Sequence, residues 1–202
     1  MNTNSFTYFG SIVTSDGGAE EDIMARLGTT RGTFIRFKNI LKSTSTSRKT
    51  KIKLYNSYVL PVLLYGAECW RMIEKDINKL SSFHNGYLRG ILKIFWPVKI
   101  SNENLHEITN STNMRAILKK YRWRWFGHVL RKPTNNITRV SLRWTPEGKR
   151  KQGRPKTTWR RTVESEMKEM DQAWSELDMK VKDREQWRKL FLALCASGSN
   201  KD

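Results

Sequence analysis

The sequence predicts a mainly α-helical protein, with a short β-strand or hairpin at its N-terminus, a basic loop containing Gly and Pro, and helices at its C-terminus. Two observations predict this fold class. Apolar residues recur every three or four positions along most of the 202 residues, the period of a helix with one buried face. β-Branched and aromatic residues concentrate near the start instead, where Gly and polar residues follow them.

The N-terminal segment Phe6 to Val13 is predicted to be a strand or hairpin, closed by the turn residues 14–18. A single strand is not stable alone. If this one pairs with a larger sheet, the partner lies outside the chain, and we expect the chain to be the tail of a longer protein.

A first helix is predicted from about Ala19 to Leu41. Its first turn holds Glu20, Glu21 and Asp22, which we interpret as exposed charges that favour a helix N-terminus, and not as metal ligands. Ser47 is predicted to cap a second helix, which Pro61 should kink or end.

A third helix is predicted from about Glu74 to Phe95, with His84 on its apolar face as a core histidine. Ser101 is predicted to cap a short helix after it.

The next helix begins near Asn113 and stops at Pro133. Its predicted core stripe is Met114, Ile117, Tyr121, Trp125 and Val129, and its other faces are cationic. A short helix over 137–144 and the loop 145–158 follow. The last helical stretch has a stripe of Trp159, Val163, Met167 and Met170, and Asp183 is predicted to cap the final helix.

The positive charge of the chain is concentrated in one stretch. From Arg115 to Arg161 there are sixteen Lys/Arg and one acidic residue, Glu147, with four tryptophans among them. Cations displace the counterions of a phosphate backbone, and flat rings stack on bases. A solvated face with core tryptophans is the alternative. The one-sided charge favours nucleic-acid binding, because a merely soluble surface mixes signs.

The candidate contacts follow from this stretch. Phosphate contacts are predicted for Lys119, Lys120, Arg122, Arg124, Lys149, Arg150, Lys151, Arg154, Lys156, Arg160 and Arg161. Trp123 or Trp144 is predicted to stack on a base, whereas Trp125 and Trp159 lie on apolar stripes and are assigned to the core. Gly153-Arg154-Pro155-Lys156 is similar to an AT-hook core, but Gln152 replaces the usual Arg before it, so general phosphate contact is the preferred interpretation.

No catalytic constellation is found in the sequence. His106-Glu107 begins a zinc-protease motif, but Asn110 stands where the second histidine must be. There is no phosphate-binding glycine loop and no aspartate pair for two magnesium ions, so no cofactor is predicted in this chain. Cys69 and Cys195 are distant in sequence, and no signal peptide or transmembrane run is found. We therefore expect an intracellular protein that is not secreted, located in the nucleus or the cytoplasm, and the run Lys149 to Lys151 favours the nucleus.

Several blocks in order resemble the C-terminal part of a non-LTR (LINE-type, RTE-like) retrotransposon endonuclease–reverse transcriptase. These blocks are FTYFGSIVTSDGG, KIKLYNSYVLPVLLYGAECW, WRWFGHVLR, GKRKQGRPKTTWRR and KDREQWRKLFLALC. The resemblance implies that the first is a primer-grip hairpin, shaped by Phe6, Tyr8, Phe9 and Gly10, and that the second belongs to a helical thumb-like bundle. Such proteins nick target DNA and copy RNA from the nick. The catalytic domains, and the aspartates that bind Mg²⁺, would precede Met1.

The resemblance implies four parts, in the order 1–18 (end of the polymerase palm), 19–112 (helical thumb-like domain), 113–161 (basic aromatic nucleic-acid-binding segment) and 162–202 (C-terminal helices). The implied partners are an RNA–DNA primer–template, target DNA and element RNA, together with the missing palm and endonuclease domains. The chain itself is expected to bind and not to catalyse. The alternatives are a non-functional retroelement remnant and a helical protein-interaction module. A membrane partner is not expected, because the basic stretch lacks a broad apolar face to insert.

Overall fold

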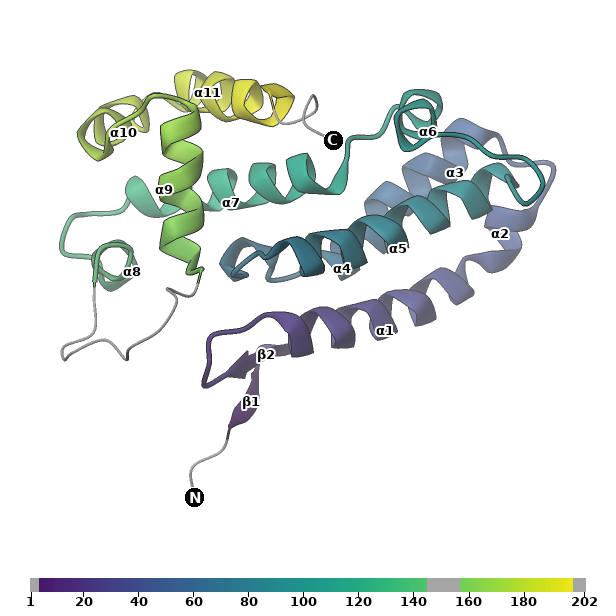
Figure 1. Ribbon diagram of the computed structural model, residues 1–202, viewed down its shortest axis with the longest axis horizontal. Coiled ribbons are helices and arrows are strands. Elements are labelled where there is room, and N and C mark those ends of the chain that lie inside the picture. Colours follow the sequence, from purple (N-terminus) through teal and green to yellow (C-terminus); the bar gives the residue numbers. More distant parts are fainter. Residues whose placement is uncertain (1–3, 145–156, 198–202) are drawn as a thin grey trace. The chain divides into compact units, whose positions relative to one another are not determined.

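The computed structural model describes residues 4–144 and 157–197 (Figure 1). The chain divides into two compact units, unit 1 (Met1–Arg115) and unit 2 (Ala116–Asp202). The predicted fold class is confirmed: in the described ranges, helices make up most of the chain and the strands are those of one N-terminal hairpin. The predicted basic loop lies outside the described residues, except for its last two positions.

The N-terminal hairpin pairs β1 (Ser5–Tyr8) with β2 (Ser11–Thr14) in antiparallel register, with Ser5 opposite Thr14. The two turn residues both have positive φ, 45° at Phe9 and 77° at Gly10. This pattern is typical of a two-residue hairpin turn, whose twist matches that of the strands. Glycine adopts it freely, whereas a bulky residue such as Phe9 is strained there.

Asp22 fastens this hairpin to helix α1 (Glu20–Arg36). Its Oδ1 accepts the backbone N–H of Ile12 at 3.0 Å, and its Oδ2 accepts the indole N–H of Trp70 at 2.8 Å. The side chain is only 3% exposed. The expectation that all three acids of this turn are exposed is therefore wrong for Asp22. Its position in the chain gives no sign of the two donors, which arrive from distant segments.

The remaining elements of unit 1 are one long helix, α5, and several short helices that pack around α1 and α5 (Figure 1). They are α2 (Lys38–Lys42), α3 (Arg48–Leu54), a π-helical turn (Tyr55–Val59), α4 (Leu60–Leu63), a 3-10 turn (Ala67–Cys69), α5 (Glu74–Leu92) and α6 (Asn102–Thr109). The predicted caps are confirmed, because Ser47 Oγ accepts the N–H of Thr50 and Ser101 Oγ accepts that of Asn104. Pro61 lies in the first turn of α4, which ends two residues later.

The core of unit 1 contains a neutral polar pair. His84, on α5, is fully buried, as predicted for a core histidine, and its Nδ1 lies 2.8 Å from the hydroxyl of Tyr55. Burial, with a smaller contribution from His106, lowers the pKa of His84 to about 4. The ring is therefore uncharged at neutral pH. Apolar side chains surround the pair, among them Val59, Leu88 and Leu105.

Unit 2 is built on α7 (Met114–Leu130), whose first turn holds the boundary between the units. The helices that follow are α8 (Ile137–Ser141), α9 (Trp159–Glu169), α10 (Trp174–Lys180) and α11 (Arg184–Ser197). In Figure 1, α9 crosses α7 steeply and α11 runs along it. The predicted cap of the final helix is confirmed, because Asp183 Oδ1 accepts the N–H groups of Glu185 and Gln186.

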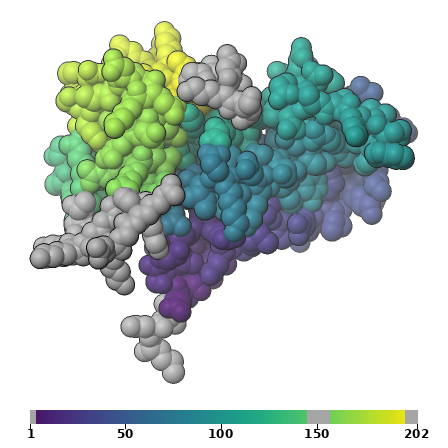
Figure 2. Space-filling view, viewed as in Figure 1, coloured from purple at the N-terminus to yellow at the C-terminus, as the bar shows by residue number. Residues whose placement is uncertain are grey.

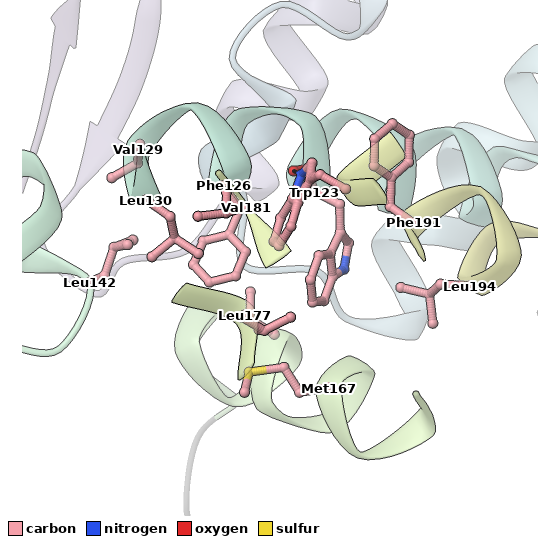
Figure 3. Close-up of a cluster of buried hydrophobic side chains, with 12 residues drawn as sticks. Trp123, Phe126, Val129, Leu130, Leu142, Met167, Leu177, Val181, Phe191 and Leu194 are labelled. Atoms are coloured by element: carbon pink, nitrogen blue, oxygen red, sulfur yellow. Dashed lines mark hydrogen bonds between the residues drawn. The ribbon is translucent and has the colours of Figure 1, made fainter. Parts of the chain in front are cut away.

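The core of unit 2 gathers side chains from α7, α9, α10 and α11, and Leu142 joins it just after α8 (Figure 3). On α7 the buried residues include Leu118, Trp123, Phe126 and Leu130. The predicted stripe has the correct period but is shifted around the helix: its ends, Met114 and Val129, are buried, whereas Ile117, Tyr121 and Trp125 are only half-buried. The buried arc of α7 is wider than one stripe, because α9 and α11 both pack on it.

Gly127 allows the closest approach in this core. The indole N–H of Trp187, on α11, donates to the carbonyl of Trp123 at 3.1 Å. A Cβ on Gly127 would lie 2.1 Å from that indole nitrogen. No residue larger than glycine fits at this position unless the two helices separate.

Candidate nucleic-acid interface

The inner side of α7 carries a buried ion pair. Arg122 is 2% exposed and Glu166, on α9, is 4% exposed. Arg122 donates from its guanidinium to Glu166 Oε1, and the indole N–H of Trp123 donates to Oε2 of the same carboxylate at 2.7 Å. Both carboxylate oxygens are thus used, and a charge that would be costly to bury alone is neutralised.

A second cation on this side is also committed to the fold. Lys119 is 8% exposed, and its Nζ lies 2.7 Å from Glu169 Oε2. Lys119, Arg122 and Trp123 were predicted as nucleic-acid contacts, but the structure gives each a buried position and an acidic partner. A fully enclosed indole cannot stack on a base, and a buried guanidinium cannot reach a phosphate. The structure therefore places these three residues in the scaffold of unit 2, and the prediction that they contact nucleic acid is not supported.

The outer side of α7 carries a different set of side chains, which we call the α7 basic ridge. Lys120, Arg124, His128 and Arg131 follow one another at spacings of three or four residues and are all exposed. In the described ranges none of them has an acidic side chain within ion-pair distance. The ridge therefore presents the cations of Lys120, Arg124 and Arg131 to solvent, with no ion-pair partner among the described residues.

Arg131 also faces a like charge. Partial burial and the nearby guanidinium of Arg184, at the start of α11, lower the pKa of Arg131 from its usual value. Its NH1 donates to the backbone carbonyl of Val181 at 3.4 Å, which positions it next to α11. Two arginines held close together favour an anion near them, because an anion would relieve their repulsion.

The other predicted contacts fall into three groups. Arg160 is half-buried, with Nε 2.9 Å from Glu164 Oε1, while Arg161 is exposed in the first turn of α9. The side chain of Trp144 is 65% exposed, as a stacking residue must be. Five predicted contacts lie outside the described residues: Lys149, Arg150, Lys151, Arg154 and Lys156.

The residues of the predicted primer grip form the exposed end of the hairpin. Phe6, Tyr8 and Phe9 are 56%, 60% and 78% exposed, and the Tyr8 and Phe9 rings meet edge to face at 4.6 Å. The guanidinium of Arg26, on α1, donates to the carbonyl of Gly10 and so ties the turn to the helix. The structure thus brings these four residues together, away from the ridge in sequence and within unit 1.

Sequence reasoning missed the acidic partners of the basic stretch. Asp178, on α10, accepts from Arg139 at 3.0 Å and from Arg143 at 2.8 Å, so two more cations are internally paired. For the inner side of α7, the sequence did contain a sign that its residues are buried. Lys119, Arg122 and Trp123 precede the core residues Phe126 and Leu130 at helical spacing, so they share a face with them.

In the part of the chain that the structure describes, no group of three His, Cys, Asp or Glu side chains could hold a metal ion. In the same part, no helix is long and apolar enough to cross a membrane.

The comparisons with known proteins identify one distant relative. The chain is 24% identical over 195 residues to an uncharacterized transposon-derived protein of Caenorhabditis elegans, an alignment that covers 91% of this chain and 68% of the relative. No protein-family model matches the sequence, and no solved structure matches it. The chain is thus distantly similar to a transposon-derived protein.

Proposed function

We propose that this chain is the nucleic-acid-binding C-terminal part of a retrotransposon reverse transcriptase, which holds primer–template and target DNA or element RNA without catalysing a reaction itself. The similarity to a transposon-derived protein supports the retroelement origin. The blocks that resemble a primer grip, a thumb and a basic C-terminal segment support the finer assignment. The Mg²⁺ of such a polymerase would be bound by its palm domain and not by the residues of this segment.

The α7 basic ridge is the observation that carries the proposal. Lys120, Arg124 and Arg131 are exposed along one side of a helix, and the described residues supply none of them with an acidic partner. Cations that are internally paired gain little from a phosphate, because they must first give up their own carboxylate. Unpaired cations release the counterions of the nucleic acid on contact, and this release drives binding.

The proposed contact set is therefore smaller than the predicted one. In the described residues it comprises Lys120, Arg124 and Arg131, with Trp144 as the exposed ring. Arg161, which is exposed on α9, stays a proposed contact on the sequence alone. Lys149, Arg150, Lys151, Arg154 and Lys156 remain proposed contacts from the sequence alone. Phe6, Tyr8, Phe9 and Gly10 remain the proposed primer grip, and their exposure along β1 and its turn supports this role.

The test is a pair of triple alanine variants with the same change of charge. Lys120, Arg124 and Arg131 are replaced in one, and three exposed residues of α3, Arg48, Lys49 and Lys53, in the other. We expect the first variant to lose roughly tenfold or more in affinity for a duplex oligonucleotide, and the second to lose much less, because overall charge acts only at long range. Equal losses in both variants would contradict the proposal.

A helical protein-interaction module is the second candidate, and one surface favours it. The turn after α5 exposes Phe95, Trp96 and Val98, which are 64%, 85% and 61% accessible. Clustered exposed apolar side chains are typical of protein contacts. Affinity for nucleic acid that resists the ridge variant, together with a change of oligomeric state on replacing Trp96, would favour this candidate.

A further inference from the structure

A pocket of about 550 Å³ opens on the surface of unit 2 between α9 and the beginning of α10. Figure 2 shows the surface of these two helices in light green. Arg161, Glu164, Ser165 and Lys168 line it from one side of α9. Met167 and Trp174 supply its apolar surface. Its volume lies in the range of sites that bind small molecules.

The rim of this pocket is positively charged. Arg161 and Lys168 stand two turns apart on α9, and both are exposed. Glu164, between them, lies 2.9 Å from the Nε of Arg160, so its charge is compensated by a residue outside the lining. The carboxylate of Glu164 is thus offset within α9, and an anion that reaches the rim meets the exposed Lys168, with Arg161 on the same side of the helix.

The apolar wall is held in place by the core of unit 2. The Trp174 ring meets the Phe126 ring edge to face, with centroids 5.6 Å apart. The guanidinium of Arg143 lies over the Trp174 ring at 5.1 Å and is itself held by Asp178. Met167, beside it, is 4% exposed. A wall that is already fixed needs no ordering when a ligand binds.

A flat apolar wall below a cationic rim matches the chemistry of a nucleotide, whose base is planar and whose phosphate is anionic. We propose that this pocket takes one base of a single-stranded nucleic acid and that Arg161 and Lys168 contact the adjacent phosphates. A single strand fits better than a duplex, because a paired base would first have to leave its stack. The inference rests on the proposed nucleic-acid binding and adds to it a site and a strand preference.

The experiment compares two strands that differ only in their bases. Fluorescence anisotropy of the full chain is measured with an oligothymidine of about twelve nucleotides and with an abasic strand of the same length and charge. We expect the full chain to bind oligothymidine roughly five- to a hundredfold more tightly, the usual effect of one base in contact with an aromatic wall.

Ser165→Trp tests whether the pocket causes this preference. Ser165 is an exposed lining residue, so an indole there fills the pocket without disturbing the core. We expect this variant to lose most of the preference for oligothymidine, and only the stacking proposed for Trp144, outside the pocket, should remain. Ala193→Trp adds the same ring at an exposed position of α11 and should keep the preference. Thermal melting of both variants confirms that they are folded.

The outcomes separate this inference from the proposed function. Equal affinity of the wild-type chain for the two strands overturns the base pocket and leaves the phosphate contacts standing. A preference that survives Ser165→Trp undiminished also overturns it, because the base is then bound elsewhere. If neither strand binds, both the proposed function and this inference are wrong.

Discussion

The two units bury polar side chains in different charge states. In unit 1, His84 is buried as a neutral ring beside the Tyr55 hydroxyl. In unit 2, Arg122 is buried as a cation against Glu166. A neutral group needs only a hydrogen bond, whereas a buried charge needs an opposite charge as well. Because of this requirement, the buried cations of the basic stretch, Lys119 and Arg122, are held by carboxylates of unit 2 and are not available to contact a phosphate.

Removing the carboxylate of unit 2 should have the largest effect. Glu166→Ala leaves the buried Arg122 without a counterion and the Trp123 indole without an acceptor. We expect the free energy of unfolding of unit 2 to fall by about 3–5 kcal/mol. Urea unfolding, together with hydrogen exchange of the α7 amides, measures this loss in the free energy of unfolding. Glu164→Ala, which breaks a half-exposed pair with Arg160, is the control and should cost less than about 1 kcal/mol.

Acid should destabilise unit 1 through His84. The pKa of His84 in the folded chain, about 4, lies below the ordinary histidine pKa of 6.5, so the unfolded chain takes up the proton first as the pH falls. Stability is full above pH 6.5 and declines as the pH falls from 6.5 toward 4, by about 3 kcal/mol in all.

Hydrogen exchange of the α5 amides, measured from pH 6.5 down to pH 4, follows this decline in the stability of unit 1. His84→Gln removes the titration while keeping a polar partner for Tyr55, so it should flatten most of the decline. Burial also lowers the pKa of His106, which should leave a smaller pH dependence. An equally steep decline in the variant would contradict the assignment to His84.

Adding one methyl group should have opposite effects in the two units. Gly127→Ala in unit 2 places a Cβ against the Trp187 indole and should cost about 1–3 kcal/mol through overpacking. Gly86→Ala, in the middle of α5 in unit 1, meets no atom within 4 Å and should stabilise its helix by about 0.5–1 kcal/mol. Thermal melting of the two variants should shift in opposite directions.

The exposed tryptophans should matter least for stability in either unit. Trp96 in unit 1 and Trp144 in unit 2 are 85% and 65% exposed. Replacing either with Ala should change the free energy of unfolding by less than about 0.5 kcal/mol. A large loss on replacing one of them would show that its ring is packed in the folded chain.

The sequence predicted the elements better than the faces they present. The caps at Ser47, Ser101 and Asp183 and the hairpin were predicted, because their signals are local. The predicted buried side of α7 differs from the observed one. Whether Trp123 or Trp125 is buried depends on contacts with α9 and α11, which lie about forty and sixty residues further along the chain. Periodicity gives the spacing of a buried stripe, but the packing of α9 and α11 determines how wide it is.

For the site, composition located the basic stretch but could not assign its members. Lys119 and Lys120 are neighbours in sequence, yet one pairs with Glu169 and the other is exposed. The acidic partners for the inner side of α7 lie on α9, and the partner of Arg139 and Arg143 lies on α10, so no local pattern connects these pairs. The pocket between α9 and α10 could not be predicted either, because it depends on how two helices meet.

The central claim is that the inner cations of α7 hold the fold, whereas its outer cations contact nucleic acid. The most direct test of this claim is the salt dependence of DNA binding by two variants of α7. The slope of log affinity against log salt concentration reports how many phosphates the protein neutralises, at about 0.9 per contact on duplex DNA. Lys120→Gln combined with Arg124→Gln should flatten the slope by about two without lowering the melting temperature. Lys119→Gln, on the inner side, should leave the slope unchanged. A slope that is unchanged in the outer variant, or flattened in the inner one, would contradict the account.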